Sequence, residues 1–378
     1  MSLQIKRLTL HNFRNYQDFC CDNLSRLNIF VGPNAVGKTN IVESIDLLTS
    51  ISSFRNPRIS ELVGPYENFV RVKTLVEDDH RFLTFEMRII DGKKTYLLND
   101  KEKRGTQLKG MIPSVVFTPD DLTMIKGSNT NRRRALDSLG SQLSPNYPVI
   151  KKDFEQILRQ KNNLLKDNPS AAFLSSIDDV FVTYATQLYC YRVSLFEKLT
   201  PYISEYYRDI SHRGETVTAE YIPSWVEENV SCETLAENAP DPHDKGQVRQ
   251  LMYNAVEKAR FKELAAKHAM IGPHKDAIRF YIDGRDAAIY GSQGQQRSLV
   301  LAWKLAEVRL IEEMFDIKPI LLLDDVMSEL DEVRRNELTK YVLESTQTFI
   351  TTTNISYFTQ EMLNQAHIVH LDYREDSE

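Results

Sequence analysis

The chain contains 378 residues, and 42% of them are hydrophobic, which is enough apolar material for a folded core in about two domains. Its formal net charge of −6 excludes a globally basic protein, so any contact with nucleic acid requires a local basic patch. The four cysteines have no C-x-x-C spacing and no apolar run approaches about 18 residues, so we expect no zinc motif and no membrane span. These features predict a reduced, cytoplasmic protein.

Short strand patterns gather at the two ends of the chain, and the middle is mostly helical in pattern. Strands are expected at residues 3–10, 27–31, 69–77, 82–90, 113–117, 320–323, 347–352 and 366–371. Apolar residues at steps of three and four from Phe173 to Leu199 predict one long helix, and 248–270 predicts another. The stretch 222–247, which has three prolines, predicts a loop-rich connection.

This layout predicts an α/β fold in two parts. One head is assembled from residues 1–122 and 270–378, and a mainly helical lobe is inserted at 123–269. The lobe is too short to form a long coiled-coil arm, and prolines interrupt it at Pro145, Pro148, Pro169, Pro201 and Pro223.

A phosphate-binding loop is the most specific motif of the chain. It fits G-x-x-x-x-G-K-[ST] at every fixed position and consists of Gly32, Pro33, Asn34, Ala35, Val36, Gly37, Lys38 and Thr39. A strand is expected before it and a helix over 38–48 after it, which is the order the motif requires. Backbone N–H groups and the helix N-terminus would hold phosphate oxygens. Lys38 would reach the β- and γ-phosphates, and the Thr39 hydroxyl would ligate Mg²⁺. The alternative is a chance Gly-rich turn.

Two acids follow the apolar run Ile320–Leu323 and predict the second half of a nucleotide site. Asp324 would hold Mg²⁺, and Asp325, pointing the other way along the strand, would face the attacking water. A helix cap or turn is the alternative interpretation. The wide separation of Thr39 from Asp324 indicates a P-loop fold interrupted by a large insertion.

A third element precedes the helix expected at 299–315. Ser292 is a good N-cap, and Gly294 permits close backbone approach beside Gln295. Such a turn at a helix N-terminus can bind an anion, although a plain helix cap explains it about as well.

These three elements, in this order, resemble the ATP-binding-cassette superfamily, with Ser292–Gln296 similar to its signature motif and Ser328–Asp331 to its D-loop. Over nearly its full length the chain more closely resembles the RecF recombination-mediator family. The matching segments are Leu10–Tyr16, Gly32–Asn40, Phe117–Leu122, Asn131–Arg134, Ile271–Asp276, Tyr290–Arg297 and Leu322–Asp331. Ala277 departs from the family, which often has a second acid there. Thr352 and Thr353 stand where many transporter ATPases have a switch histidine.

The resemblance implies an ABC-type P-loop ATPase head that binds ATP and Mg²⁺ and dimerises with a second copy when ATP is bound. Each signature turn would contact the ATP held by the partner's P-loop. Asn40 and Arg14 would belong to the nucleotide site, although a strand-end turn also accounts for Arg14. The dimer would clamp duplex DNA near single-strand gaps and assist recombinase loading with RecO and RecR. Slow, DNA-stimulated hydrolysis would then release it. The competing interpretations are a transporter ATPase subunit, an SMC-like chromosome ATPase and a scaffold that only binds ATP.

Two basic clusters are candidates for contact with the DNA backbone, Lys101, Lys103 and Arg104 in one and Arg132, Arg133 and Arg134 in the other. Each has a plain alternative, a solvated surface without a partner, and an arginine of the second cluster could instead pair with a carboxylate. Neither cluster has interleaved aromatic residues, so recognition of backbone and shape is expected. Glu43 could be only a charge on the helix face, and a structural role is expected for His274.

Overall fold

The computed structural model describes residues 3–64, 67–78, 81–167, 169–211, 214–226, 241–344 and 347–372. Most of the loop-rich connection expected at 222–247 lies outside the described residues, because 227–240 are not among them. Cys232 lies outside them as well, whereas Cys20, Cys21 and Cys190 are free thiols.

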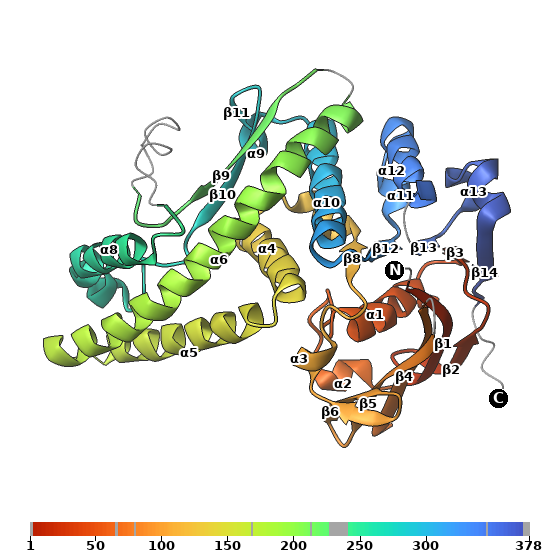
Figure 1. Cartoon of the computed structure of the whole chain (residues 1–378), viewed down its shortest axis with the longest axis horizontal. Helices are drawn as coiled ribbons and strands as arrows, with labels where there is room; N and C mark the ends of the chain where they lie inside the picture. The colour runs from red at the N-terminus through yellow and green to blue at the C-terminus, as the bar shows by residue number, and fades with distance from the viewer. Residues whose placement is uncertain are drawn as a thin grey trace. The chain divides into compact units, whose positions relative to one another are not determined.

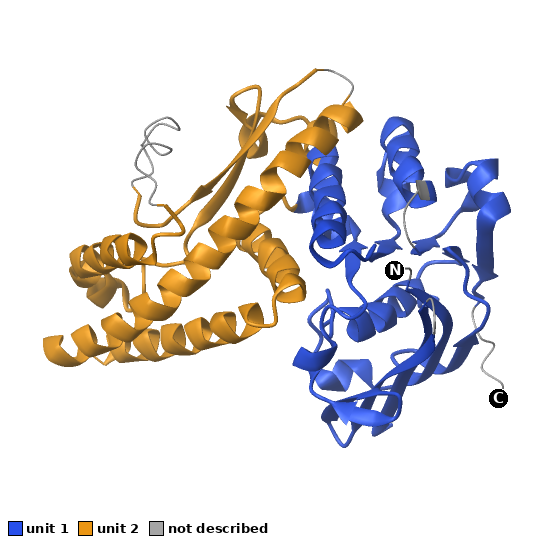
Figure 2. Ribbon diagram, viewed as in Figure 1, with its two compact units in different colours: residues 1–123, 297–378 blue, residues 124–296 orange. Residues whose placement is uncertain are grey.

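The chain divides into two compact units (Figure 2). The first consists of residues 1–123 and 297–378 and the second of 124–296. A head built from both chain ends is thereby confirmed. The first boundary falls within one residue of the expected position, but the second falls at 296/297 and not at 269/270. The reason is that strand β10 (Ala277–Ile282) pairs antiparallel with β9 (Val217–Ile222), so this segment packs with the lobe.

A parallel sheet, five-stranded within the described residues, forms the centre of the first unit (Figure 1). Its strands, in sheet order, are β14 (Ala366–His370), β3 (Leu27–Val31), β13 (Thr348–Thr352), β12 (Ile320–Asp324) and β8 (Ser114–Phe117). Both β12 and β13 are buried along their whole length, which agrees with the continuous apolar pattern of β12. Because neighbouring strands are parallel, the segments that follow β3 and β12 emerge at the same edge.

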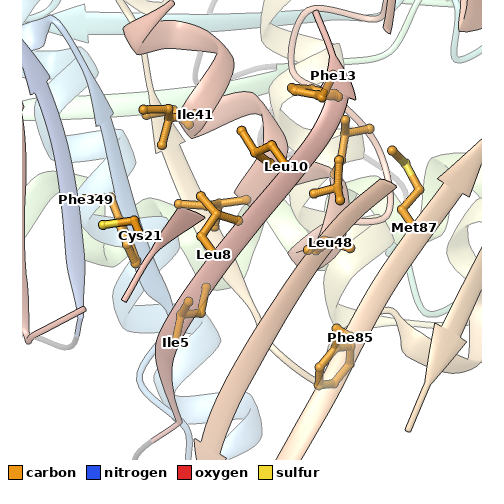
Figure 3. Close-up of a cluster of buried hydrophobic side chains, with 14 of the residues drawn as sticks. Ile5, Leu8, Leu10, Phe13, Cys21, Ile41, Leu48, Phe85, Met87 and Phe349 are labelled. Carbon is orange, nitrogen blue, oxygen red and sulfur yellow. The ribbon is translucent and has the colours of Figure 1, made fainter. Parts of the chain in front are cut away.

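The same unit contains an antiparallel sheet, six-stranded within the described residues. Its order is β2 (Tyr16–Cys21), β1 (Gln4–Phe13), β4 (Phe69–Asp78), β5 (Arg81–Ile90), β6 (Lys93–Leu98) and β7 (Lys101–Lys103). Alternate residues of β1 and β4 are buried, as expected for a sheet with one face on the core. Figure 3 shows this core, in which Ile5, Leu8 and Leu10 follow one another along β1, and Ile41 and Leu48 belong to the same buried cluster.

Helices of the first unit connect and cover these strands. They are α1 (Lys38–Thr49), α2 (Ile59–Leu62), α3 (Gly105–Leu108), η1 (Pro119–Thr123), α11 (Val326–Glu329), α12 (Glu332–Glu344), η2 (Ile355–Tyr357) and α13 (Gln360–Gln365). The boundary between the units falls within α10 (Gln293–Phe315), which begins six residues earlier than the helix expected at 299–315. Ser292 directly precedes it, as the N-cap prediction requires.

The second unit is mainly helical, as expected. Its helices are α4 (Asn129–Leu143), α5 (Tyr147–Lys166), α6 (Ala171–Ser211), α8 (Lys245–Ala266) and α9 (Ala287–Tyr290), and β11 (Arg285–Asp286) extends the β9–β10 pair. Helix α6 continues through Pro201, because Leu199, Ile203 and Tyr207 continue its buried face across the missing hydrogen bond. Helix α8 ends before 270, since Lys267 adopts a left-handed conformation with φ 59°.

In the part of the chain that the structure describes, no helix combines the length and the apolar composition that crossing a membrane requires.

Candidate nucleotide site

The loop between β3 and α1 has the backbone conformation of a phosphate cradle. Gly37 has φ 108°, which L-residues with a side chain rarely adopt, and a Cβ there would lie 2.6 Å from Asn15 Nδ2. A Cβ on Gly32 would lie 2.5 Å from the Leu371 carbonyl oxygen. Pro33, Asn34 and Ala35 form the exposed tip, and Ala35 is also left-handed with φ 65°. The two glycines are therefore required by crowding and by backbone geometry.

The N-terminus of α1 faces this loop without a side-chain cap from any described residue. A helix N-terminus without a side-chain cap can receive an anion on its first N–H groups, and the helix dipole adds positive potential there. The Lys38 ammonium lies over the loop and donates to the carbonyls of Gly32 at 2.8 Å and Pro33 at 2.7 Å. Burial lowers the pKa of Lys38, and the charges of Asp325 and Asp324 oppose that change.

Asp324, at the end of β12, meets Thr39 across the sheet edge. The Thr39 hydroxyl donates to Asp324 Oδ1 at 3.0 Å, joining residues 285 positions apart in the sequence. The Thr351 hydroxyl donates to the same oxygen at 2.7 Å. Burial raises the pKa of Asp324, and the hydrogen bonds from Thr351 and Thr39 and the charge of Arg55 partly offset this. The predicted pairing of the two Mg²⁺ ligand candidates is thus present in the geometry.

Asp325 adopts a left-handed conformation, with φ 52° and ψ 23°, immediately after the strand. Its N–H is held by the Thr351 carbonyl at 3.1 Å and by the Thr351 hydroxyl at 3.0 Å. Its Oδ1 is buried and has no hydrogen-bond partner among the described residues. Burial raises the pKa of the Asp325 carboxyl, and the charge of Lys38 lowers it in part. A strained residue with an unsatisfied carboxylate oxygen fits a group that receives a proton from water.

The oxygen donors of Thr39 and Asp324 fit the coordination chemistry of Mg²⁺. Among the described residues no group of three or more His, Cys, Asp or Glu gathers into a metal cage. Mg²⁺ is usually bound through one or two carboxylates together with phosphate oxygens and water. A threonine hydroxyl touching one carboxylate beside a phosphate-binding loop fits that chemistry.

Two residues that the sequence did not indicate, Thr351 and Arg55, join this edge together with Glu43. Thr351 is brought to Asp324 by the register of β13 on β12. Glu43 is fully buried and is not a surface charge of α1, so that interpretation is wrong. Arg55 contacts both Glu43 and Asn40. The sequence around Arg55 contains no recognisable motif. The burial of Glu43 could not be predicted either, because the buried face of α1 is defined by the sheets that it packs against.

Arg14 lies in the turn between β1 and β2, in a left-handed conformation with φ 56°. Its guanidinium donates to Glu43 Oε2 at 3.0 Å, Glu43 Oε1 at 2.8 Å and the Glu61 carbonyl at 2.8 Å. Two of its five N–H groups are not used in these bonds. Asn40 donates to Asn15 Oδ1 at 2.7 Å, and Asn15 donates to the Val36 carbonyl at 3.0 Å. Asn40 is therefore connected to the loop through Asn15, and Arg14 is connected to Asn40 through Glu43 and Arg55.

The Ser292 turn lies in the second unit and forms a reciprocal helix cap. Gln295 N donates to Ser292 Oγ at 3.2 Å, and Ser292 N donates to Gln295 Oε1 at 2.8 Å. Gln295 also donates to Glu215 at 2.9 Å. Ser292 is exposed and Gly294 is half-buried. The structure therefore contains the plain cap, and anion binding by this turn stays a prediction.

The two basic clusters differ in how much charge they expose. Lys101 and Arg104 are exposed and Lys103 is half-buried on and beside the edge strand β7. Edge-strand lysines also prevent sheet-to-sheet pairing, so the plain alternative stays open. These three residues remain candidates for contact with a phosphate backbone.

Arg132 of the second cluster requires a correction. Its side chain is buried, and Nη1 donates to the carbonyls of Met124 at 3.0 Å, Ile125 at 2.6 Å and Gly127 at 3.0 Å. Withdrawing it to reach DNA would leave those carbonyls without their donor, so Arg132 is a structural residue. Arg133 donates to the Asp276 carbonyl and is half-buried, and Arg134 is exposed. The triple consists of one buried, one half-buried and one exposed arginine because consecutive residues of a helix face different directions.

The sequence and the fold are both similar to those of known proteins. A family model described as RecF/RecN/SMC N terminal domain matches residues 4–375. The DNA replication and repair protein RecF of Heliobacterium modesticaldum is 36% identical over 377 residues, covering 98% of this chain and 97% of that protein. A solved structure of the recombination mediator protein RecF-ATPrS in the RecFOR pathway has a TM-score of 0.85 at 29% identity, covering 99% of each chain. A RecF-ATP structure has a TM-score of 0.82 at 30% identity, covering 95% of this chain and 94% of that one.

The fold and the site together define an ABC-type P-loop ATPase head of the RecF, RecN and SMC class. The long second unit is inserted between the two halves of that head, as the wide spacing of the two motifs predicts. Within this class, the chain belongs to the RecF family.

Proposed function

We propose that this protein is an ATP-dependent DNA-binding ATPase that acts as a recombination mediator in DNA replication and repair. The observation that carries the proposal is the contact of Thr39 with Asp324, beside the buried and unsatisfied oxygen of Asp325. Metal-assisted phosphoryl transfer needs this combination of a metal-holding pair and a neighbouring base. Family membership supports it, since the similar solved proteins are RecF-ATPrS and RecF-ATP.

Each residue of the site has a distinct part in this chemistry. Backbone N–H groups at the start of α1 hold phosphate oxygens, and Lys38 exchanges its two carbonyl acceptors for phosphate. Mg²⁺, when bound, would be held by Thr39 and Asp324 and would neutralise charge on the β- and γ-phosphates. Asp325 orients a water and accepts its proton, and its raised pKa makes it a stronger base than an exposed carboxylate.

Dimerisation would depend on the turn that contains Ser292, Gly294 and Gln295, at the N-terminus of α10. Ser292 is exposed at the N-terminus of α10, a helix of 23 residues with a dipole that favours negative charge. A second copy would bring this turn, through Ser292, Gly294 and Gln295, to the γ-phosphate held by the first copy's P-loop. ATP would then stabilise the dimer by binding to it more tightly than to the monomer, and hydrolysis would release it.

DNA binding would follow from dimerisation. In the two candidate clusters, the exposed or partly exposed basic residues are Lys101, Lys103, Arg104, Arg133 and Arg134. On a chain with a net charge of −6 these residues form only small local patches. Two copies would align their patches along a duplex, so binding to DNA near a single-strand gap would depend on ATP and decrease with salt. Partners of the RecO and RecR type would use the loaded dimer to place a recombinase on single-stranded DNA.

The oligomeric state tests this function directly. Asp325→Asn should block turnover and trap a dimer with Mg-ATP, whereas Mg-ADP should leave a monomer. Ser292→Arg should abolish the dimer and leave ATP binding by the monomer intact. Size-exclusion chromatography with light scattering reports both. A dimer with the same affinity in ATP and ADP would contradict the nucleotide-driven clamp.

A second measurement tests the DNA part. Replacing Lys101, Lys103 and Arg104 by alanine should weaken ATP-dependent duplex binding and flatten its salt dependence, because fewer counterions are released. Fluorescence anisotropy at several salt concentrations measures this. Arg132→Ala is unsuitable for this test, since its loss would disturb the start of α4. An unchanged salt slope in the triple variant would remove this cluster from the DNA surface.

A further inference from the structure

Glu43 is the centre of a buried charge cluster beside the phosphate-binding loop. It lies on α1, five positions after Lys38, and its side chain is fully buried. It accepts from Arg14 through two hydrogen bonds, from the Ser53 hydroxyl at 2.7 Å, and pairs with Arg55 at 3.4 Å. A carboxylate removed from water requires such partners. The Glu43 carboxylate therefore binds Arg14 of the β1–β2 turn and also Ser53 and Arg55 of the segment that follows α1.

The cluster continues to the loop itself. Arg55 Nη1 also donates to Asn40 Oδ1 at 2.9 Å, and Asn40 Nδ2 donates to Asn15 Oδ1 at 2.7 Å. Asn15 Nδ2 then donates to the Val36 carbonyl at 3.0 Å. A continuous path of hydrogen bonds thus runs from the buried carboxylate to the backbone of the phosphate-binding loop.

Neither arginine belongs to a helix or a strand, so no regular secondary structure fixes the backbone from which its side chain extends. Arg14 sits in a left-handed turn, and Arg55 lies between α1 and α2. The side chain of Arg14 is 17% exposed and that of Arg55 is 43% exposed. Without the carboxylate, Arg55 would spend much of its time in solvent, because long cationic side chains are strongly hydrated and lose entropy when fixed.

We infer that Glu43 is a positioning residue of the nucleotide site, which holds Arg14 and Arg55 beside the phosphate-binding loop so that their charge favours a bound triphosphate. This inference rests on the proposed ATP-binding function. It assigns Glu43 no contact with the nucleotide. Its effect passes through the arginines and through the Asn40–Asn15 path.

A purely structural role is the competing explanation, and the chain provides a matched control. Glu86 on β5 is also buried and also bonded to two arginines, Arg71 and Arg88. It lies within the antiparallel sheet, and none of its described contacts leads to the phosphate-binding loop. Glu43→Gln and Glu86→Gln therefore make the same chemical change in the same unit.

The first test compares these two variants for affinity to Mg-ATP, measured by titration calorimetry in the Asp325→Asn background. Glu43→Gln should raise the dissociation constant about tenfold, as expected for a weakened charge contact to phosphate. Glu86→Gln should change it less than about twofold, since none of its described contacts leads to the loop. Equal changes in the two variants would overturn the inference.

A double-mutant cycle then asks whether Glu43 acts through Arg55. Adding Arg55→Gln to Glu43→Gln should cause little further loss of ATP affinity, because the positioned charge is already lost. If the two losses multiply as independent effects, Glu43 does not act through Arg55 and the inference fails. Glu43→Asp is the second variant should Glu43→Gln fold poorly. It retains the charge but has a shorter reach, so it should lose affinity about threefold, and an effect no larger than that of Glu86→Asp would also overturn the inference.

Lys38→Ala separates this inference from the proposed function. If the parent protein binds Mg-ATP and Lys38→Ala does not, the nucleotide site stands and the Glu43 comparison decides only the positioning role. If the parent protein and Lys38→Ala bind Mg-ATP equally, or neither binds it, the proposed function and the inference fail together.

Discussion

Two buried glutamates of the first unit are each bonded to a pair of arginines, and they differ in where those arginines originate. The partners of Glu86, Arg71 and Arg88, lie on β4 and β5, whose backbone is already fixed by sheet hydrogen bonds. The partners of Glu43 lie in a turn and in an inter-helix segment. The same ion-pair chemistry thus reinforces regular structure in the sheet and positions irregular structure at the nucleotide edge.

The largest expected contrast concerns turnover. Asp325→Asn should reduce ATP hydrolysis about 1,000-fold, because an amide cannot accept the proton of the attacking water as the carboxylate with its unsatisfied oxygen would. Glu86→Gln should leave the rate of hydrolysis within about twofold of the parent rate, since Glu86 bonds arginines of the antiparallel sheet. Phosphate release under saturating Mg-ATP and DNA measures both. Substantial residual turnover in Asp325→Asn would assign the base to another residue.

Gly37 at the nucleotide edge and Gly92 in a turn of the antiparallel sheet allow the same comparison for the backbone, since both have a positive φ. Gly37→Ala should weaken ATP binding about 100-fold, because φ 108° is unfavourable for alanine and the new Cβ would meet Asn15. Gly92, between β5 and β6, also has a positive φ of 74°, but a Cβ there meets nothing within 4 Å. Gly92→Ala should therefore cost about 1 kcal/mol of stability and leave ATP affinity unchanged. Titration calorimetry and urea unfolding separate the two effects, and equal ATP affinities would refute the steric argument.

Replacing each of the two glutamates by alanine should lower the free energy of unfolding by different amounts. Glu43→Ala should cost about 2 to 3 kcal/mol, because it leaves Arg14, at 17% exposure, without its carboxylate. Glu86→Ala should cost about 1 kcal/mol, since Arg71 and Arg88 are 38% and 33% exposed and water can replace the acid. Urea unfolding monitored by circular dichroism gives both values. The reverse order would show that exposure of the arginines does not control the cost.

The smallest expected contrast is in pH dependence. Burial raises the pKa of Asp46, on α1, to about 7, so the folded protein binds a proton that the unfolded chain releases near pH 4. That contribution to stability is present at low pH and is lost as pH rises through 7. Asp46→Asn should therefore be on the order of 1 kcal/mol more stable than the parent at pH 8.

Glu86 should show the opposite sign. Burial by itself would raise its pKa, but the hydrogen bonds from Arg88 and Arg71 outweigh burial and lower it. Its contribution is therefore present above the unfolded pKa and is lost as pH falls through the lower folded value. Unfolding of the parent, Asp46→Asn and Glu86→Gln from about pH 2 to about pH 8 measures the two slopes, because the Glu86 change lies below its unfolded pKa and the Asp46 change lies above its own. Slopes of the same sign would contradict these assignments.

Local patterns in the sequence predicted the phosphate-binding loop, the acidic end of β12 and the cap at Ser292, because each is a contiguous stretch with its own strand or helix context. The strands that they predicted at both chain ends are present to within a few residues, but β2, β6 and β7 of the antiparallel sheet were missed. The second domain boundary differed because the pairing of β10 with β9 joins segments 55 or more residues apart, a choice made by the sheet and not by local composition.

The residues of this chain sufficed to specify a P-loop head with a large insertion, since turn chemistry, helix dipoles and apolar periodicity act over a few neighbouring positions. Folding alone decided that Thr351 would touch Asp324, that Glu43 would be buried with Arg14 and Arg55, and that Arg132 would be withdrawn from solvent. Those outcomes depend on strand register and on which face of a helix meets the core. Both are set by contacts between distant segments, and a single sequence does not display them.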